Sequence, residues 1–136
     1  MIIEASAKNI RISPEKVRLV VAQIKKMPPQ KAVQMLSFVN KSPSPVLKKV
    51  IASAIANAKN NHGVSQKDLI FKEILVGKGS MLKRYQPVAR GRAHHILKRS
   101  SHIKIVLESK TGEIKSPKTP QIAEASKESK RIKDDK

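Results

Sequence analysis

Residues 74–107 form a long internal segment without a single Asp or Glu, and this segment limits what the chain can fold into. It contains eight Lys or Arg, whose mutual repulsion would weaken any isolated two-stranded ribbon that this segment formed. Apolar residues are interspersed with these cations, and Pro87 and Gly91 supply turn-forming residues near the midpoint. Pairing of 74–86 with 92–104 would give a ribbon about 40 Å long. A solvated loop would mix both signs of charge, so we expect a protruding β-hairpin arm.

Three amphipathic segments that precede the arm predict helices. Apolar residues recur every three or four positions in 13–26, where Ser13 is a candidate N-cap followed by a proline at the first helical position. A shorter stripe of the same period follows Pro29, and the clearest one runs through 46–63. Gly63 is suited to the left-handed residue that ends this third helix. Its outer face is made of small residues, which indicates either simple helix propensity or a neighbouring surface packed closely against it.

The remaining segments of the first 109 residues predict strands. Residues 2–10 precede the first helix, the sequence LIFKEILV begins at Leu69, and HIKIVLE ends at Glu108. Ile103 and Ile105 fall on one face of the last strand because side chains alternate along a strand. The predicted fold class is therefore α+β: three helices packed on a small three-stranded antiparallel sheet with a long protruding β-hairpin.

Charge is concentrated in the part of the chain that we expect to fold. The formal net charge is +19, and residues 1–109 hold 21 of the basic and five of the acidic residues. We expect one domain over 1–109, with the arm at about 77–102, and a disordered tail over 110–136 that is rich in Ser, Lys, Glu and Pro. So basic a domain calls for an acidic partner, with nucleic acid first and an anionic membrane surface second. The absence of cysteine and of a membrane-length apolar run favours a soluble intracellular protein.

Few residues in the sequence suit catalysis or metal binding. His94, His95 and His102 have no carboxylate nearby in the sequence, and the chain contains no cysteine to complete a zinc site. No nucleophile has an evident base, and no glycine-rich phosphate loop is present. We expect no enzyme, no cofactor and no metal. Only three aromatic residues are available for stacking, so nucleic-acid binding would depend mainly on phosphate contacts.

Three separated segments resemble one known family. The sequences IRISPEKVRLVV (10–21), VLKKVIASAIANAKNN (46–61) and LKRYQPVARGRAHHILKRSSHIKIVLE (82–108) are similar to the large-subunit ribosomal protein twenty-two family of bacterial type. The resemblance runs in order through about residues 5–108. It implies three helices on a three-stranded sheet, in a structural protein of the cytoplasmic ribosome that acts as a monomer within the large subunit.

The resemblance also implies partners and contact residues. These partners are large-subunit (23S-type) rRNA, neighbouring large-subunit proteins, and the nascent peptide, because the family's hairpin lines the exit tunnel close to a macrolide-binding constriction. The tunnel tip corresponds to Pro87, Val88, Ala89, Arg90 and Gly91. The implied rRNA contacts are Lys8, Asn9, Arg11, Ser13, Lys16, Arg18, Lys78, Lys83, Arg84, Arg90, Arg92, Lys98, Arg99 and His102.

The sequence departs from the family pattern at two places in the arm. The family usually has a basic residue after the tip proline, whereas Val88 stands there in this chain. The lead-in GKGSM (77–81) lacks a proline that is often found in the family. We expect the first departure to change a local contact of the tip and the second to change how the hairpin bends.

Two other functions fit parts of the sequence. An architectural DNA-binding protein can carry a basic ribbon whose proline wedges between base steps, but such arms come from dimers with a large apolar interface. A protein bound to a membrane surface needs large apolar faces rich in aromatic residues. Neither feature is evident in this sequence, so a ribosomal RNA-binding protein is the prediction that accounts for most of the chain.

Overall fold

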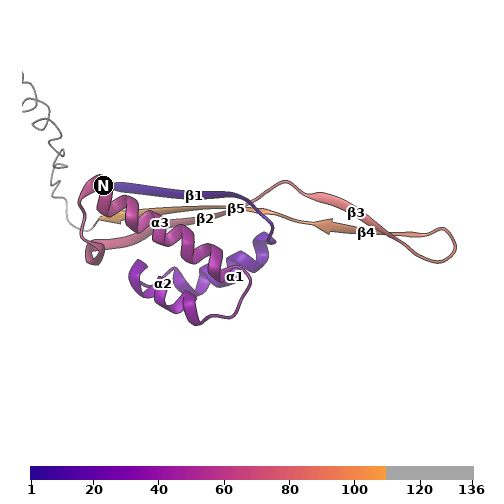
Figure 1. The fold of residues 1–136 in the computed structure, drawn as a ribbon, viewed down its shortest axis with the longest axis horizontal. Coiled ribbons are helices and arrows are strands. Elements are labelled where there is room, and N and C mark those ends of the chain that lie inside the picture. Colours follow the sequence, from indigo (N-terminus) through magenta and orange to yellow (C-terminus); the bar gives the residue numbers. More distant parts are fainter. Residues whose placement is uncertain (110–136) are drawn as a thin grey trace, which may run out of the picture.

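The computed structural model describes residues 1–109, which fold into a helix-covered sheet with a long arm (Figure 1). The expected tail at 110–136 lies outside the described residues. The α+β class is confirmed, since helices and antiparallel strands are both present. The elements are β1 (Ile2–Ile10), α1 (Pro14–Ile24), α2 (Pro29–Phe38), α3 (Ser44–His62), a short 3₁₀ helix (Gln66–Asp68), β2 (Leu69–Lys78), β3 (Leu82–Pro87), β4 (Ala93–Lys98) and β5 (Ser101–Ser109).

The last strand of the described chain lies at the centre of the main sheet. The strand order is β1-β5-β2, and β5 is antiparallel to both neighbours. Strands β3 and β4 form a separate antiparallel pair that continues away from the sheet. The three helices lie on one side of the sheet, and the arm runs out from its end nearly in line with the strands (Figure 1). None of the helices within 1–109 is long and apolar enough to span a membrane.

The core lies between the helices and one face of the sheet. Ile103, Ile105 and Leu107 alternate along β5 and are almost completely buried, which confirms the expected period of two. The helices contribute their apolar stripes because residues three and four positions apart share a helix face. The largest buried apolar side chains that the helices add are Val17, Ile24, Leu47 and Ile51.

The expected helix ends are largely confirmed. Ser13 lies at the N-cap of α1, although its side chain makes no capping hydrogen bond. Gly63 has a φ of 61°, in the left-handed region, and ends α3 as predicted. The Val64 N–H donates to Ala58 O at 3.2 Å, which satisfies a carbonyl of the last turn. The small residues on the outer face of α3 are exposed in this chain.

The expected strands over 74–86 and 92–104 do pair with each other, but the pairing is interrupted by a short joint and is not one continuous ribbon. The sheet ladder ends at the pair Lys78–Ser101, and the arm ladder begins at the pair Leu82–Lys98. Residues 79–81, which follow β2, therefore face only residues 99 and 100, which follow β4. In this joint the Gly79 N–H donates to Ser100 O at 2.9 Å, and the Ser100 hydroxyl donates to Ser80 O. The arm is thus attached through a bulged, hydrogen-bonded joint.

Gly79 is required in this joint because no side chain fits there. A Cβ at this position would lie 2.5 Å from Ser100 Oγ and 3.2 Å from the Ser100 carbonyl carbon. We expect Gly79→Val to lower the free energy of unfolding by about 1–3 kcal/mol, as overpacking does elsewhere. Urea denaturation measures this change. The matched control is Gly77→Val, because a Cβ at 77 meets only His102 Cβ, at 3.8 Å. Equal stability of the two variants would contradict a tight joint.

Candidate nucleic-acid interface

The arm presents cations on both of its faces. All residues of β3 and β4 are exposed. Since side chains alternate along a strand, Lys83 lies on one face of the ribbon, whereas Arg84 and Lys98 lie on the other. The register places each of Lys83, Arg84 and Lys98 opposite an apolar residue. Like charges therefore never face each other directly across this ladder, which removes a source of destabilisation.

The tip is a tight turn with two consecutive left-handed residues. Arg90 has a φ of 61° and Gly91 a φ of 67°, and the Val88 N–H donates to Arg92 O at 2.9 Å. Glycine adopts this conformation without strain, whereas arginine rarely does. Val88 is half-buried, although the residues next to it in the turn are exposed. The turn thus directs the Arg90 side chain outward and folds the Val88 side chain partly inward.

A second group of predicted residues meets at a bulge in β1. The register of β1 against β5 shifts between Ala7 and Ile10, and Asn9 has a φ of 55° within this bulge. Asparagine tolerates the left-handed region better than most residues. The Asn9 N–H donates to Nδ1 of His102 at 3.0 Å. The bulge therefore brings Asn9, His102 and the neighbouring Lys8 together, although 93 positions separate the bonded pair in the sequence.

The start of α1 provides a third group, whose members have different roles. Arg11 and Lys16 are exposed, and Ser13 is half-buried at the N-cap. The Arg18 Nη2 donates to Val76 O at 3.0 Å, so this side chain ties α1 to the edge of β2. Arg18 thus has a structural contact besides the nucleic-acid contact expected from the sequence.

The root of the arm forms a basic pocket around one acid. Lys78 and Arg99 line a cavity of about 290 Å³ together with Pro14, Glu15 and residues of the joint. Glu15 makes no ion pair within 1–109. The cations of the arm root thus lie close to the first turn of α1, which connects the arm surface to the α1 surface.

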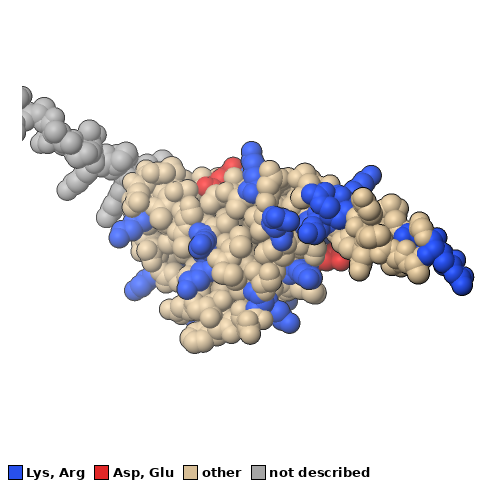
Figure 2. Space-filling model, turned by 45° about the vertical axis from the view of Figure 1, so that its right-hand side comes forward, with Lys and Arg blue, Asp and Glu red and all other residues tan. Residues whose placement is uncertain are grey.

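Basic side chains gather along the arm to its tip, and the acidic side chains visible in the same view occupy two small areas (Figure 2). The described ion pairs hold Glu4 to Lys104, at 2.9 Å, and Glu108 to Lys72, at 3.8 Å. All four residues lie in the main sheet and none in the arm. The cations of the arm therefore have no carboxylate partner within the described chain.

The histidines of the arm do not converge. His94 and His95 are adjacent in β4, so their side chains point to opposite faces of the ribbon. His102 accepts a hydrogen bond from the Asn9 N–H at the β1 bulge. Among residues 1–109 there is no group of three His, Asp or Glu side chains that could hold a metal ion.

Sequence reasoning missed several features of this interface. Tyr85 is 72% exposed and lies directly opposite His95, which gives the arm an aromatic pair on one face. The left-handed Arg90 and the bond of Arg18 to β2 also have no signal in the sequence. The unusual φ of Asn9 could have been suspected, because asparagine is enriched in such conformations.

Comparison with known proteins decides the family. The model of the family described as Ribosomal protein L22p/L17e matches residues 5–108. The chain belongs to this family. A Pediococcus pentosaceus protein named large ribosomal subunit protein uL22 is 43% identical over 107 residues, covering 79% of this chain and 91% of the relative. A Staphylococcus aureus protein of the same name is 44% identical over 112 residues, covering 82% and 96%.

Family membership confirms the resemblance and its coarse consequences. The family comprises structural constituents of the large ribosomal subunit, which in bacteria is cytoplasmic, and its members are structural rather than catalytic. The chain therefore associates with the ribosome, its RNA and its other proteins as a large-subunit protein.

Proposed function

We propose that residues 1–109 form one RNA-binding domain that binds 23S-type rRNA, braces it during subunit assembly and lines the nascent-peptide exit tunnel with its arm. The observation that carries this proposal is the arm itself, which has cations on both faces, no acid and no buried residue along β3 and β4. Such a ribbon buries too little to be stabilised alone, and a surrounding polyanion would hold it from both sides.

The mechanism is electrostatic positioning. Each Lys or Arg that neutralises a phosphate releases condensed counterions, and this release supplies affinity without reading sequence. Arginine adds forked hydrogen bonds and stacking that lysine cannot provide. Tyr85 and His95 add an exposed aromatic surface on which an unpaired base can stack. The proposed contact residues are those that the resemblance implied, with Tyr85 and His95 added.

The tip would form the part of the tunnel wall that the nascent peptide passes. Val88 places an apolar side chain where the family usually has a cation, so the wall there carries less positive charge. In this arrangement the protein acts as a single copy, beside neighbouring large-subunit proteins. The proposal is tested by asking whether the tagged chain co-sediments with large subunits through a high-salt wash. Release of the chain at moderate salt would contradict an integral role.

Single cations at the tip should make measurable contributions to RNA binding. We expect Arg90→Asn and Arg92→Gln each to lower the slope of log K against log salt by up to about one. Asparagine is chosen at position 90 because it tolerates the left-handed φ of 61° that the turn imposes. Filter binding of 23S-type rRNA over a series of KCl concentrations measures the slope. An unchanged slope in both variants would show that the tip does not contact phosphate.

A further inference from the structure

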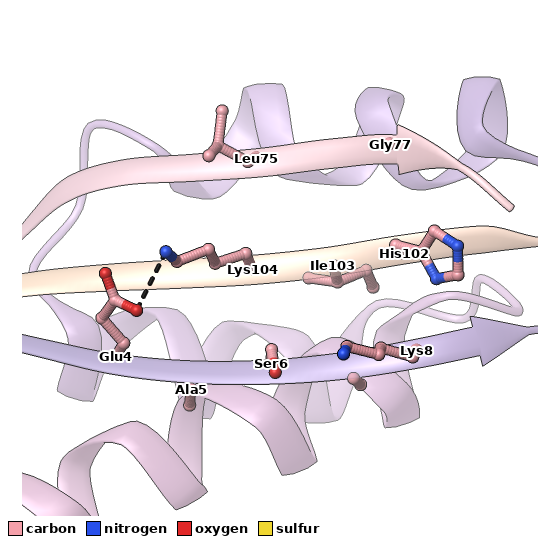
Figure 3. Close-up of a pocket in the computed structure, with 10 residues that line it drawn as sticks. Glu4, Ala5, Ser6, Lys8, Leu75, Gly77, His102, Ile103 and Lys104 are labelled. Atoms are coloured by element: carbon pink, nitrogen blue, oxygen red, sulfur yellow. Dashed lines mark ion pairs between the residues drawn. The ribbon is translucent and has the colours of Figure 1, made fainter.

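A hollow lies on the face of the main sheet that the helices leave open (Figure 3), and its lining residues belong to the main sheet, with none from β3 or β4. Its volume is about 700 Å³, within the range of small-molecule and cofactor sites in proteins. All three strands of the sheet contribute to it. The lining residues that matter are Glu4, Lys8, Leu75, Gly77, His102 and Lys104.

The imidazole of His102 is held in a defined orientation on this face. Its Nδ1 accepts the N–H of Asn9 at 3.0 Å, and the left-handed backbone of Asn9 directs that N–H toward the ring. In a neutral imidazole with an accepting Nδ1, the proton resides on Nε2. The ring is therefore a fixed aromatic plate with one further donor, Nε2–H, available to a ligand. It belongs to a half-buried residue, so part of its surface remains open.

Gly77 leaves space beside this ring. It is paired directly with His102 across the β2–β5 ladder, where a side chain would normally pack against its partner. A Cβ at position 77 would have only His102 Cβ within 4 Å, so any larger side chain there would extend into the hollow. Leu75, two residues earlier on the same face, is 44% exposed and adds an apolar wall. A flat group can therefore enter beside the ring.

The charges around the hollow suit one phosphate. Lys104 is paired with Glu4 at 2.9 Å, and the pair is drawn in Figure 3. Lys8 is exposed and takes part in no ion pair of the described chain. The hollow thus offers one uncompensated cation, and the Glu4 carboxylate can accept a hydrogen bond from a base amino group.

We propose that this hollow binds a single unstacked nucleotide of the ribosomal RNA, with its base stacked on His102 and its phosphate beside Lys8. The combination of a fixed aromatic ring, an apolar wall and one free cation matches how proteins bind splayed bases of single-stranded RNA. The inference rests on the proposed function, because it names one RNA contact on a surface that the arm does not reach.

NMR of the full chain can distinguish binding of the base from binding of the phosphates. Hexa-adenylate RNA is titrated while the ring signals of His102 are followed, and an abasic hexamer of equal charge is the control. We expect hexa-adenylate to shift the His102 signals upfield, as a stacked base does, and the abasic hexamer to leave them in place. Equal shifts with both probes, or none with either, would overturn the proposal.

Gly77→Val tests the site in the RNA complex, and Gly77→Ala is its matched control. Valine suits a strand and fills the space beside the ring, whereas alanine adds only the Cβ that the structure accommodates. We expect Gly77→Val to abolish the base-dependent shift and to weaken 23S-type rRNA binding by about 5- to 150-fold, the range for loss of one stacked base. Full rRNA affinity in Gly77→Val would overturn the nucleotide site alone. Loss of subunit co-sedimentation by the unmodified chain would instead contradict the proposed function.

Discussion

Replacing six cations of the arm, Arg90 with asparagine and the other five with glutamine, should reduce the salt dependence of rRNA binding more than any other change to the surface. Each phosphate contact contributes about 0.7–0.9 to the slope of log K against log salt, so the slope should fall by about four to five. A protein with six such contacts loses about a thousandfold in affinity between 50 and 200 mM salt, and the variant should lose far less. Filter binding across that range measures both quantities. The replaced residues are Lys83, Arg84, Arg90, Arg92, Lys98 and Arg99.

The control for this experiment removes the same charge from another surface. Six lysines of the helical side, none of them in the proposed interface, are replaced with glutamine in a second variant. If only the net charge of the whole protein matters, the slope of log K against log salt falls by the same amount in both variants. If the arm contacts RNA, the control variant retains most of this slope. Equal losses would therefore contradict the assignment of the interface to the arm. The control residues are Lys25, Lys26, Lys31, Lys41, Lys48 and Lys49.

Ile105→Ala should have the largest effect on folding. Ile105 lies in the central strand and is completely buried against the helices. Truncation of a buried isoleucine to alanine costs about 2–5 kcal/mol, a large part of the 5–15 kcal/mol that stabilises a typical domain. We expect the melting temperature to fall by about 8–40 °C, because each kcal/mol corresponds to about 4–8 °C in a domain of this size. Urea and thermal denaturation monitored by circular dichroism measure the loss.

The same substitution in the arm supplies the comparison. Ile96 is 41% exposed, and no residue of β4 is buried. Surface substitutions usually change stability by no more than about 0.5 kcal/mol, so Ile96→Ala should melt almost like the unmodified chain. A large loss of stability in Ile96→Ala would show that the arm contributes to the folded core. A small loss in Ile105→Ala would contradict the central position of β5.

Periodicity predicted the helices and the buried face of β5 because burial imposes a repeat on the sequence. The stripe through Val17 and Ile24 and the alternation of Ile103 and Ile105 are both direct records of core packing. Gly63 was predictable for a related reason, since few residues other than glycine readily adopt a left-handed φ. These elements depend on local geometry and a single buried face, which one sequence displays.

The joint of the arm could not be predicted, because its cause is a contact between distant residues. The bulge depends on the close approach of Gly79 to Ser100, and nothing in the neighbouring sequence specifies that partner. The continuous ribbon that alternation suggested is therefore interrupted.

The sequence predicted which cations form the candidate interface, but not how they are arranged on it. The acid-free segment identified the cations, but not their distribution over two faces opposite apolar partners. The predicted role of His102 also required the structure, because the bond from Asn9 fixes which ring nitrogen remains available. Arg18 was expected to contact RNA, and its bond to Val76 O shows that part of its role is to hold α1 to the sheet.

The central position of β5 determines how the body responds to mechanical load. β2 and β5 both lead into the arm, so a pull along the arm draws these two strands together as one unit. Their motion would be opposed by the ladder between β5 and β1 and by the helices packed on the sheet. That ladder lies parallel to the pull, so its hydrogen bonds must break together rather than one after another. The arm is therefore anchored in shear, the geometry in which a β-sheet offers most resistance to traction.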